Sequence, residues 1–166
     1  MTVEIDQGPA YKIGKIDYEG ASIPRAQLIK LAKLTEGDPV NMELVKKAQA
    51  AIELAQRRQG YLQTKSEVKR SMQEASKTVD FAFEIEPGPQ YSMGQLAIVG
   101  LDIETEPAIR KMWGLQEGKP FSVDYPQRFL DRVKEGGVFE NLKSTRFENK
   151  VNDAKLKVDV TLYFNK

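Results

Sequence analysis

The stretch Glu4–Gly20, EIDQGPAYKIGKIDYEG, occurs a second time eighty residues later as Glu84–Gly100, EIEPGPQYSMGQLAIVG. An ungapped pairing leaves seven identical positions, which are Glu4/Glu84, Ile5/Ile85, Gly8/Gly88, Pro9/Pro89, Tyr11/Tyr91, Gly14/Gly94 and Gly20/Gly100. Each copy is typical of a strand end, a Gly-Pro break and a new strand that ends at a glycine. A repeat of this period predicts two similar units in tandem.

The pattern of apolar residues predicts the same order of elements in both halves of the 166-residue chain: strand, helix, helix, strand, strand. In the first half the expected ranges are Tyr11–Glu19, Pro24–Leu34, Asn41–Arg58, Tyr61–Met72 and Val79–Ile85. In the second half they are Tyr91–Val99, Thr105–Trp113, Ser122–Val133, Lys143–Asn152 and Leu156–Phe164.

Two such units predict an α+β fold. In each unit we expect a three-stranded mixed sheet that is covered on one face by two helices. The strict alternation at Val79–Ile85 predicts a central strand, whereas the polar Tyr61–Met72 is typical of an edge strand.

The repeat also predicts the domain boundaries. We expect one domain at 9–87 and a second at 88–166. Residues 1–8 are expected to be the remnant of the last strand of a preceding repeat, because Thr2–Ile5 corresponds to the end of the strand before the Gly-Pro break.

The residue inventory argues against an enzyme. The chain has no histidine and no cysteine, so it lacks the commonest general base, the commonest metal ligand and any thiolate. The carboxylates of Asp6, Glu36, Asp38 and Glu117 match no recognised site and are interpreted as parts of solvated turns. The sequence therefore predicts no catalytic residue, no cofactor and no metal.

Charge and hydropathy exclude two further classes of protein. The net charge is +1 without a long basic run, so the electrostatic footprint of a nucleic-acid-binding protein is missing. No run of about eighteen apolar residues is present, so the sequence predicts no membrane-spanning helix.

Several short motifs, each weak alone, recur in register in both halves. They are the Gly-Pro-Tyr-Gly openings at Asp6–Gly20 and Glu86–Gly100, the loops Leu34–Asn41 and Leu115–Ser122, and the turns Gly60–Leu62 and Gly137–Phe139. With the order of elements, these motifs resemble POTRA (polypeptide-transport-associated) domains over essentially the whole chain.

This resemblance implies a non-catalytic, periplasmic part of an outer-membrane assembly or translocation factor of the BamA and TamA type. The implied partners are unfolded or nascent outer-membrane polypeptides, accessory lipoproteins, further POTRA repeats and the membrane β-barrel of the parent chain. The mechanism that the family implies is β-augmentation, in which a client strand adds to an exposed sheet edge. Barrel assembly, secretion and cell division remain open as the branch of the family.

The two polar strands are the candidate peptide-binding edges, and the first is preferred because it is the longer stretch. The candidate residues are Leu62, Thr64, Ser66, Val68, Arg70, Lys143, Thr145 and Phe147. One alternative is that these are solvated edges whose lysines prevent aggregation. Another is that the repeats act as a structural spacer that binds no client.

Overall fold

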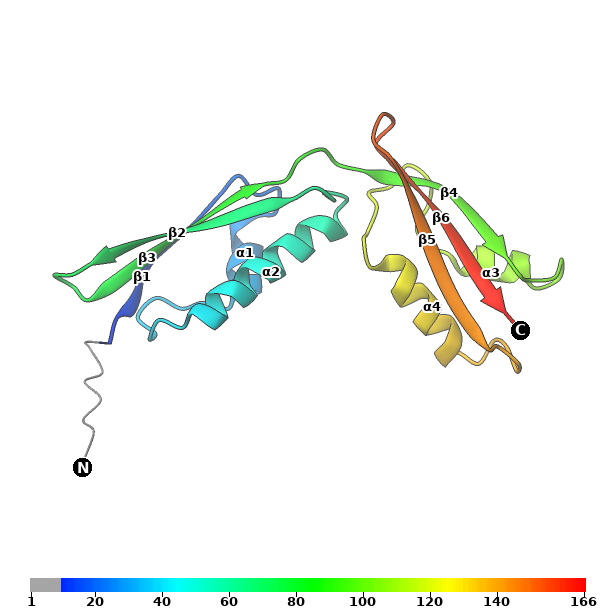
Figure 1. The fold of residues 1–166 in the computed structure, drawn as a ribbon, viewed down its shortest axis with the longest axis horizontal. Coiled ribbons are helices and arrows are strands. Elements are labelled where there is room, and N and C mark those ends of the chain that lie inside the picture. The colour runs from blue at the N-terminus through cyan, green and yellow to red at the C-terminus, as the bar shows by residue number, and fades with distance from the viewer. Residues whose placement is uncertain (1–9) are drawn as a thin grey trace, which may run out of the picture. The chain divides into compact units, whose positions relative to one another are not determined.

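The computed structural model describes residues 10–166, so the remnant strand predicted at 1–8 lies outside the described residues. In the first unit the elements follow the predicted order (Figure 1). They are β1 (Lys12–Glu19), α1 (Arg25–Ala32), α2 (Met42–Arg58), β2 (Lys65–Gln73) and β3 (Thr78–Glu86).

The second unit repeats this order. Its elements are β4 (Ser92–Val99), α3 (Glu106–Met112), α4 (Tyr125–Glu135), β5 (Ser144–Asn152) and β6 (Lys157–Asn165). The predicted α+β fold of tandem strand-helix-helix-strand-strand units is confirmed.

Each sheet has three strands of mixed direction, in the order β1-β3-β2 and β4-β6-β5. The last strand of each unit is central, parallel to the first strand and antiparallel to the strand before it. In β3 the side chains of Val79, Phe81, Phe83 and Ile85 are buried and alternate with more exposed neighbours. The central position follows from this alternation, because a strand paired on both sides buries one complete face.

A separate hydrophobic core lies between the sheet and the helices of each unit. In the first unit Phe81 and Phe83 pack with Leu28 of α1 and Ile52 of α2. The core of the second unit contains Phe129 of α4 and the equivalent residues of β6. Among residues 10–166, no helix is both long and apolar enough to cross a membrane.

Four predicted element ends differ from the structure by two or more residues. Helix α4 spans Tyr125–Glu135 and not Ser122–Val133, and the other two ends have a backbone cause. Helix α1 ends at Ala32, two residues early, because Lys33 adopts the left-handed conformation with φ 52°. Strand β2 begins at Lys65 and not at Tyr61, because Gly60 with φ 93° opens a turn that continues through Thr64.

The chain forms two compact units whose membership is not strictly sequential. One contains the described residues through Gln56 together with Thr64–Pro87, and the other contains Arg57–Gln63 together with Gly88–Lys166. The segment Arg57–Gln63 therefore packs with the second unit, although it precedes the 87/88 boundary that the repeat predicts.

Candidate functional site

Strand β2 is an edge strand, as its polarity predicts. Among the residues that the structure describes, it pairs with β3 and with no other strand. Ser66, Val68 and Arg70 lie at alternate positions on the face towards the helices, and Val68 packs against the first core. Three of the eight candidate residues therefore lie on this edge.

Leu62 and Thr64 do not belong to the edge, which corrects the predicted strand. Thr64 is only 3% exposed, and its hydroxyl donates a hydrogen bond to the carbonyl oxygen of Pro87 at 3.3 Å. Leu62 packs against the core of the second unit. Both residues precede β2, which begins at Lys65, so neither belongs to the strand that pairs with β3.

A side chain of helix α2 binds the backbone near the start of β2. The side-chain amide of Gln49 donates to the carbonyl oxygen and to the hydroxyl oxygen of Ser66, both at 3.0 Å. The Ser66 hydroxyl in turn donates to the carboxylate of Glu53. Because the Ser66 carbonyl already accepts a hydrogen bond from Gln49, an added strand would compete with this contact there. The only sequence signal for this contact is the polar pair Gln49 and Glu53, four residues apart on the helix.

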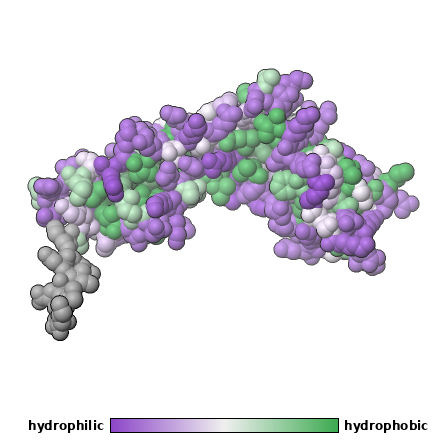
Figure 2. Space-filling view, in the orientation of Figure 1, coloured by the Kyte–Doolittle hydropathy of each residue, from purple (hydrophilic) through white to green (hydrophobic). Residues whose placement is uncertain are grey.

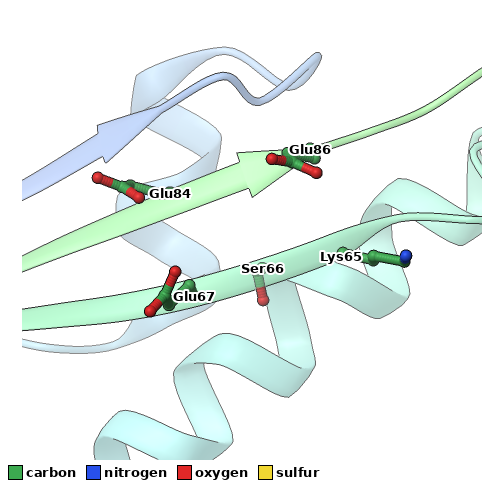
Figure 3. Close-up of a pocket in the computed structure, with 5 residues that line it drawn as sticks. All are labelled: Lys65, Ser66, Glu67, Glu84 and Glu86. Atoms are coloured by element: carbon green, nitrogen blue, oxygen red, sulfur yellow. The ribbon is translucent and has the colours of Figure 1, made fainter.

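The outer face of this sheet is charged. A shallow pocket of about 340 Å³ is lined by Lys65, Ser66, Glu67, Glu84 and Glu86 (Figure 3). In Figure 3 the Ser66 side chain turns towards α2, whereas the carboxylates line the two strands. Lys69 forms an ion pair with Glu84 at 2.9 Å, and this hydrogen bond raises the pKa of the Lys69 ammonium group. Over residues 10–166, no group of three or more acidic side chains is arranged to hold a metal ion.

Strand β5 is the corresponding edge of the second sheet and pairs with β6 alone among the described strands. Lys143 lies just before it and donates its backbone N–H to the carbonyl of Asn165 at 2.8 Å. Thr145 and Phe147 lie on the strand, and Phe147 packs against the second core. The hydroxyl oxygen of Thr145 is buried without a hydrogen-bond partner among the residues described.

The outer face of β5 carries a compact charged group. The guanidinium of Arg146 lies 3.7 Å from the centre of the Tyr163 ring and forms an ion pair with Glu148. The hydrogen bonds from Arg146 and from the Tyr163 hydroxyl lower the pKa of the Glu148 carboxyl. This group lies on the strand pair β5–β6.

The two edges are equal in length but differ in access. Both β2 and β5 have nine residues, so the difference in length that favoured the first edge is absent. The position equivalent to Gln49 is Leu130 in α4, whose apolar side chain cannot bind a backbone carbonyl. On β2 a helix side chain therefore binds a backbone carbonyl of the edge strand. On β5 the residue at the equivalent helix position makes no such contact.

Comparison with known proteins agrees with this architecture. Residues 11–88 match the model of the POTRA family, described as a surface antigen variable number repeat. The outer membrane protein assembly factor BamA of Neisseria meningitidis is 25% identical over 145 residues, which are 86% of this chain and 18% of that protein. The chain therefore spans less than a fifth of the length of this relative.

Two solved structures of BamA share the fold. POTRA domains 3–5 of the Haemophilus influenzae protein align over 94% of this chain and 61% of that chain, with a TM-score of 0.63 and 20% identity. The Haemophilus ducreyi protein lacking POTRA domains 1–3 aligns over 95% of this chain and 29% of that chain, with a TM-score of 0.69 and 16% identity. The first unit therefore matches the POTRA family, and the second unit repeats its order of elements.

Proposed function

We propose that this chain is a periplasmic, non-catalytic scaffold module of an outer-membrane protein assembly factor, and that it binds polypeptide segments by strand addition. The observation that carries the proposal is that, among residues 10–166, one edge of each sheet is a nine-residue strand paired on one side only. Main-chain N–H and C=O groups along such a strand bind an extended peptide with little dependence on its sequence. A module that handles many different clients needs this tolerance.

Strand β5 is the preferred site. The Gln49 amide competes for the Ser66 carbonyl on β2, and β5 has no equivalent contact. Unfolded outer-membrane polypeptides are the proposed clients, and accessory lipoproteins are proposed as further partners because the relative is an assembly factor.

The second candidate function is a spacer that sets distances within a larger assembly and binds no client. The observation in its favour is the charge on β2, where Lys65, Lys69 and Arg70 lie on the edge strand. Charged side chains on an edge strand commonly oppose the addition of another chain.

An NMR titration distinguishes these two functions. The ¹⁵N-labelled chain is titrated with an unfolded peptide from a strand of an outer-membrane protein, and we expect amide shifts concentrated in β5, with smaller shifts in β2. The control peptide has the same side chains but alternate N-methylated amides, which removes the donors of one edge. Shifts with the first peptide alone support strand addition. Equal shifts with both peptides contradict it, and the absence of shifts with either peptide favours the spacer.

A further inference from the structure

Each sheet has a second edge, formed by its first strand. Among the described strands, β1 pairs with β3 alone and β4 pairs with β6 alone. The second half of β4, Leu96–Val99, is uncharged and apolar, and Val99 is 47% exposed. Figure 2 shows hydrophobic surface among hydrophilic side chains on the visible face of the second unit. An apolar edge strand without charged side chains is prone to pair with another chain.

The first half of this edge is closed by main-chain hydrogen bonds from a loop. Met93 of β4 donates its N–H to the carbonyl of Lys119 at 2.7 Å, and its own carbonyl accepts the N–H of Gly118 at 2.8 Å. In the first unit, Ile13 of β1 makes the equivalent pair of bonds with the loop between α1 and α2, both at 2.8 Å. These main-chain groups are therefore not available to an added strand.

A guanidinium binds the backbone at the middle of the β4 edge. Nη1 of Arg110, in α3, donates to the carbonyl oxygen of Leu96 at 2.9 Å, and Nη2 donates to the carboxylate of Glu106 at 2.8 Å. Glu106 lies one helical turn earlier and holds the guanidinium in this position. The Arg110 side chain is 47% exposed, so the contact lies at the surface. Beyond it, only Ala97–Val99 remain of β4.

The first unit makes the same contact through a different residue. Ile16 of β1 corresponds to Leu96 in the eighty-residue repeat, and its carbonyl accepts a hydrogen bond from Arg25 at 3.2 Å. Arg25 is the first residue of α1, whereas Arg110 lies one turn into α3. The equivalent strand carbonyl is thus bound by a guanidinium in both units, although the two arginines stand at different positions of the repeat.

We propose that Arg110, with Arg25 in the first unit, is a specificity-determining residue of strand addition. It excludes polypeptides from the edge of the first strand, so that a client adds only at the opposite edge of each sheet; the client is that of the proposed function, on which this inference rests. A strand that approaches β4 needs the Leu96 carbonyl and must remove a charged donor from it. Hydrogen bonds from charged donors are stronger than those from a neutral client amide.

Arg110 should matter more than Arg25. Strand β1 carries Asp17 and Glu19 beyond the bound carbonyl, and charged side chains on an edge strand oppose the addition of another chain. Strand β4 has no charged side chain along its whole length. Arg110 therefore supplies a charge that the strand itself lacks.

The test is an NMR titration of the full chain with Arg110→Met, which keeps the apolar stem and removes the donors. The titrant is the unfolded outer-membrane peptide described above. We expect new amide shifts at Ala97–Val99, at peptide concentrations at least about fivefold below those that shift these amides in the natural chain, because a charged donor no longer competes. The matched control is Lys111→Met, which removes the same charge from the next, exposed residue of α3 and should leave β4 unshifted.

A second measurement needs no client. Without the guanidinium, the apolar edge of one copy can pair with that of another. In sedimentation velocity, the Arg110→Met chain should self-associate with a dissociation constant at least about fivefold lower than that of the natural chain or of Lys111→Met. Amide protection of β6 checks that each variant remains folded.

The outcomes separate this inference from the proposed function. If the peptide shifts β5 but not β4 in Arg110→Met, the inference is wrong and the proposed function stands. If no chain responds to the peptide, the proposed function is contradicted, and self-association then decides: stronger association of Arg110→Met supports exclusion at β4, and unchanged association overturns it. Equal β4 shifts in Arg110→Met and Lys111→Met would assign the effect to net charge. Lost protection of β6 in Arg110→Met would make the contact a purely structural anchor of α3. Either result contradicts the inference.

Discussion

At the scale of single residues, two glycines at the centre of the repeated stretch, Gly14 and Gly94, each lie against an aspartate of the central strand. Gly14 and Gly94 lie where the pairing register of the first strand shifts, between Ile13 and Ile16 and between Met93 and Leu96. In the second unit a carboxylate oxygen of Asp159 accepts the N–H of Gln95 at 2.7 Å. A Cβ atom at Gly94 would lie 2.1 Å from that oxygen, so a side chain there would force the Asp159 carboxylate to move. Asp80 makes the same contact beside Gly14.

A double-mutant cycle tests this contact. We expect Gly94→Ala to lower the free energy of unfolding by about 1–3 kcal/mol, because the new methyl group collides with the Asp159 carboxylate. Asp159→Ala should cost about 1 kcal/mol for the lost hydrogen bond. The double variant should lose less than the sum, since the collision is then absent. Urea denaturation measures all three variants, and strictly additive losses would contradict the proposed collision.

At the scale of elements, a carboxylate organises the start of α4. Asp124 is the N-cap residue of α4 and contacts Arg58 at 2.7 Å and Arg128 at 3.3 Å. Burial alone would raise the pKa of this carboxyl, but the hydrogen bond from Arg58 and the two guanidinium charges outweigh it and lower the pKa. The ionised form is therefore favoured in the folded chain.

The sign of this shift predicts a pH dependence. A lowered pKa stabilises the fold at pH values above 3.8, the ordinary value, and the stabilisation is lost as the pH falls through the lower pKa of the folded state. Asp124→Asn should lower the free energy of unfolding at pH 7 by about 1 kcal/mol or less, because the pair is partly exposed. Between about pH 5 and pH 2 its stability should fall less steeply than that of the natural chain.

Chemical denaturation at a series of pH values measures this effect. The control is Asp131→Asn, an exposed carboxylate on the same helix whose hydrogen bond is to the neutral Gln127. If both variants show the same pH profile, Asp124 has no special part in the stability of this helix end.

At the scale of the whole molecule, the chain has two cores, each confined to one compact unit. Phe83 and Leu162 occupy equivalent central positions on β3 and β6, and both are fully buried. Each side chain lies within the hydrophobic cluster of its own unit. The two cores should therefore respond separately to mutation.

Two reciprocal variants test this independence. Phe83→Ala should destabilise the first unit by about 3–5 kcal/mol, and Leu162→Ala should destabilise the second by about 2–5 kcal/mol. Amide hydrogen exchange should show lost protection mainly in β3 for the first variant and mainly in β6 for the second. A similar loss in both sheets for either variant would mean that the chain unfolds as one cooperative unit.

The sequence alone determined the order of elements, the central strands and the polar edges. Alternation in β3 and in β6 is a local property, since neighbouring residues of a strand face opposite sides of the sheet. The sequence also identified Ser66, Val68, Arg70, Thr145 and Phe147 as residues of the two edges. It assigned Leu62 and Thr64 wrongly, because the apolar Leu62 is equally compatible with an alternating strand and with a turn packed on a core.

Only the tertiary structure decided what each edge and each turn contacts. The contact of Gln49 with Ser66 joins residues seventeen positions apart, and that of Arg58 with Asp124 joins residues sixty-six positions apart. No local pattern encodes such pairs, because they depend on how helices pack on sheets. The repeated stretch therefore determines that there are two similar units. The packing around them determines that Gln49 binds the β2 backbone, with no equivalent contact on β5, and that Arg110 binds the backbone of β4.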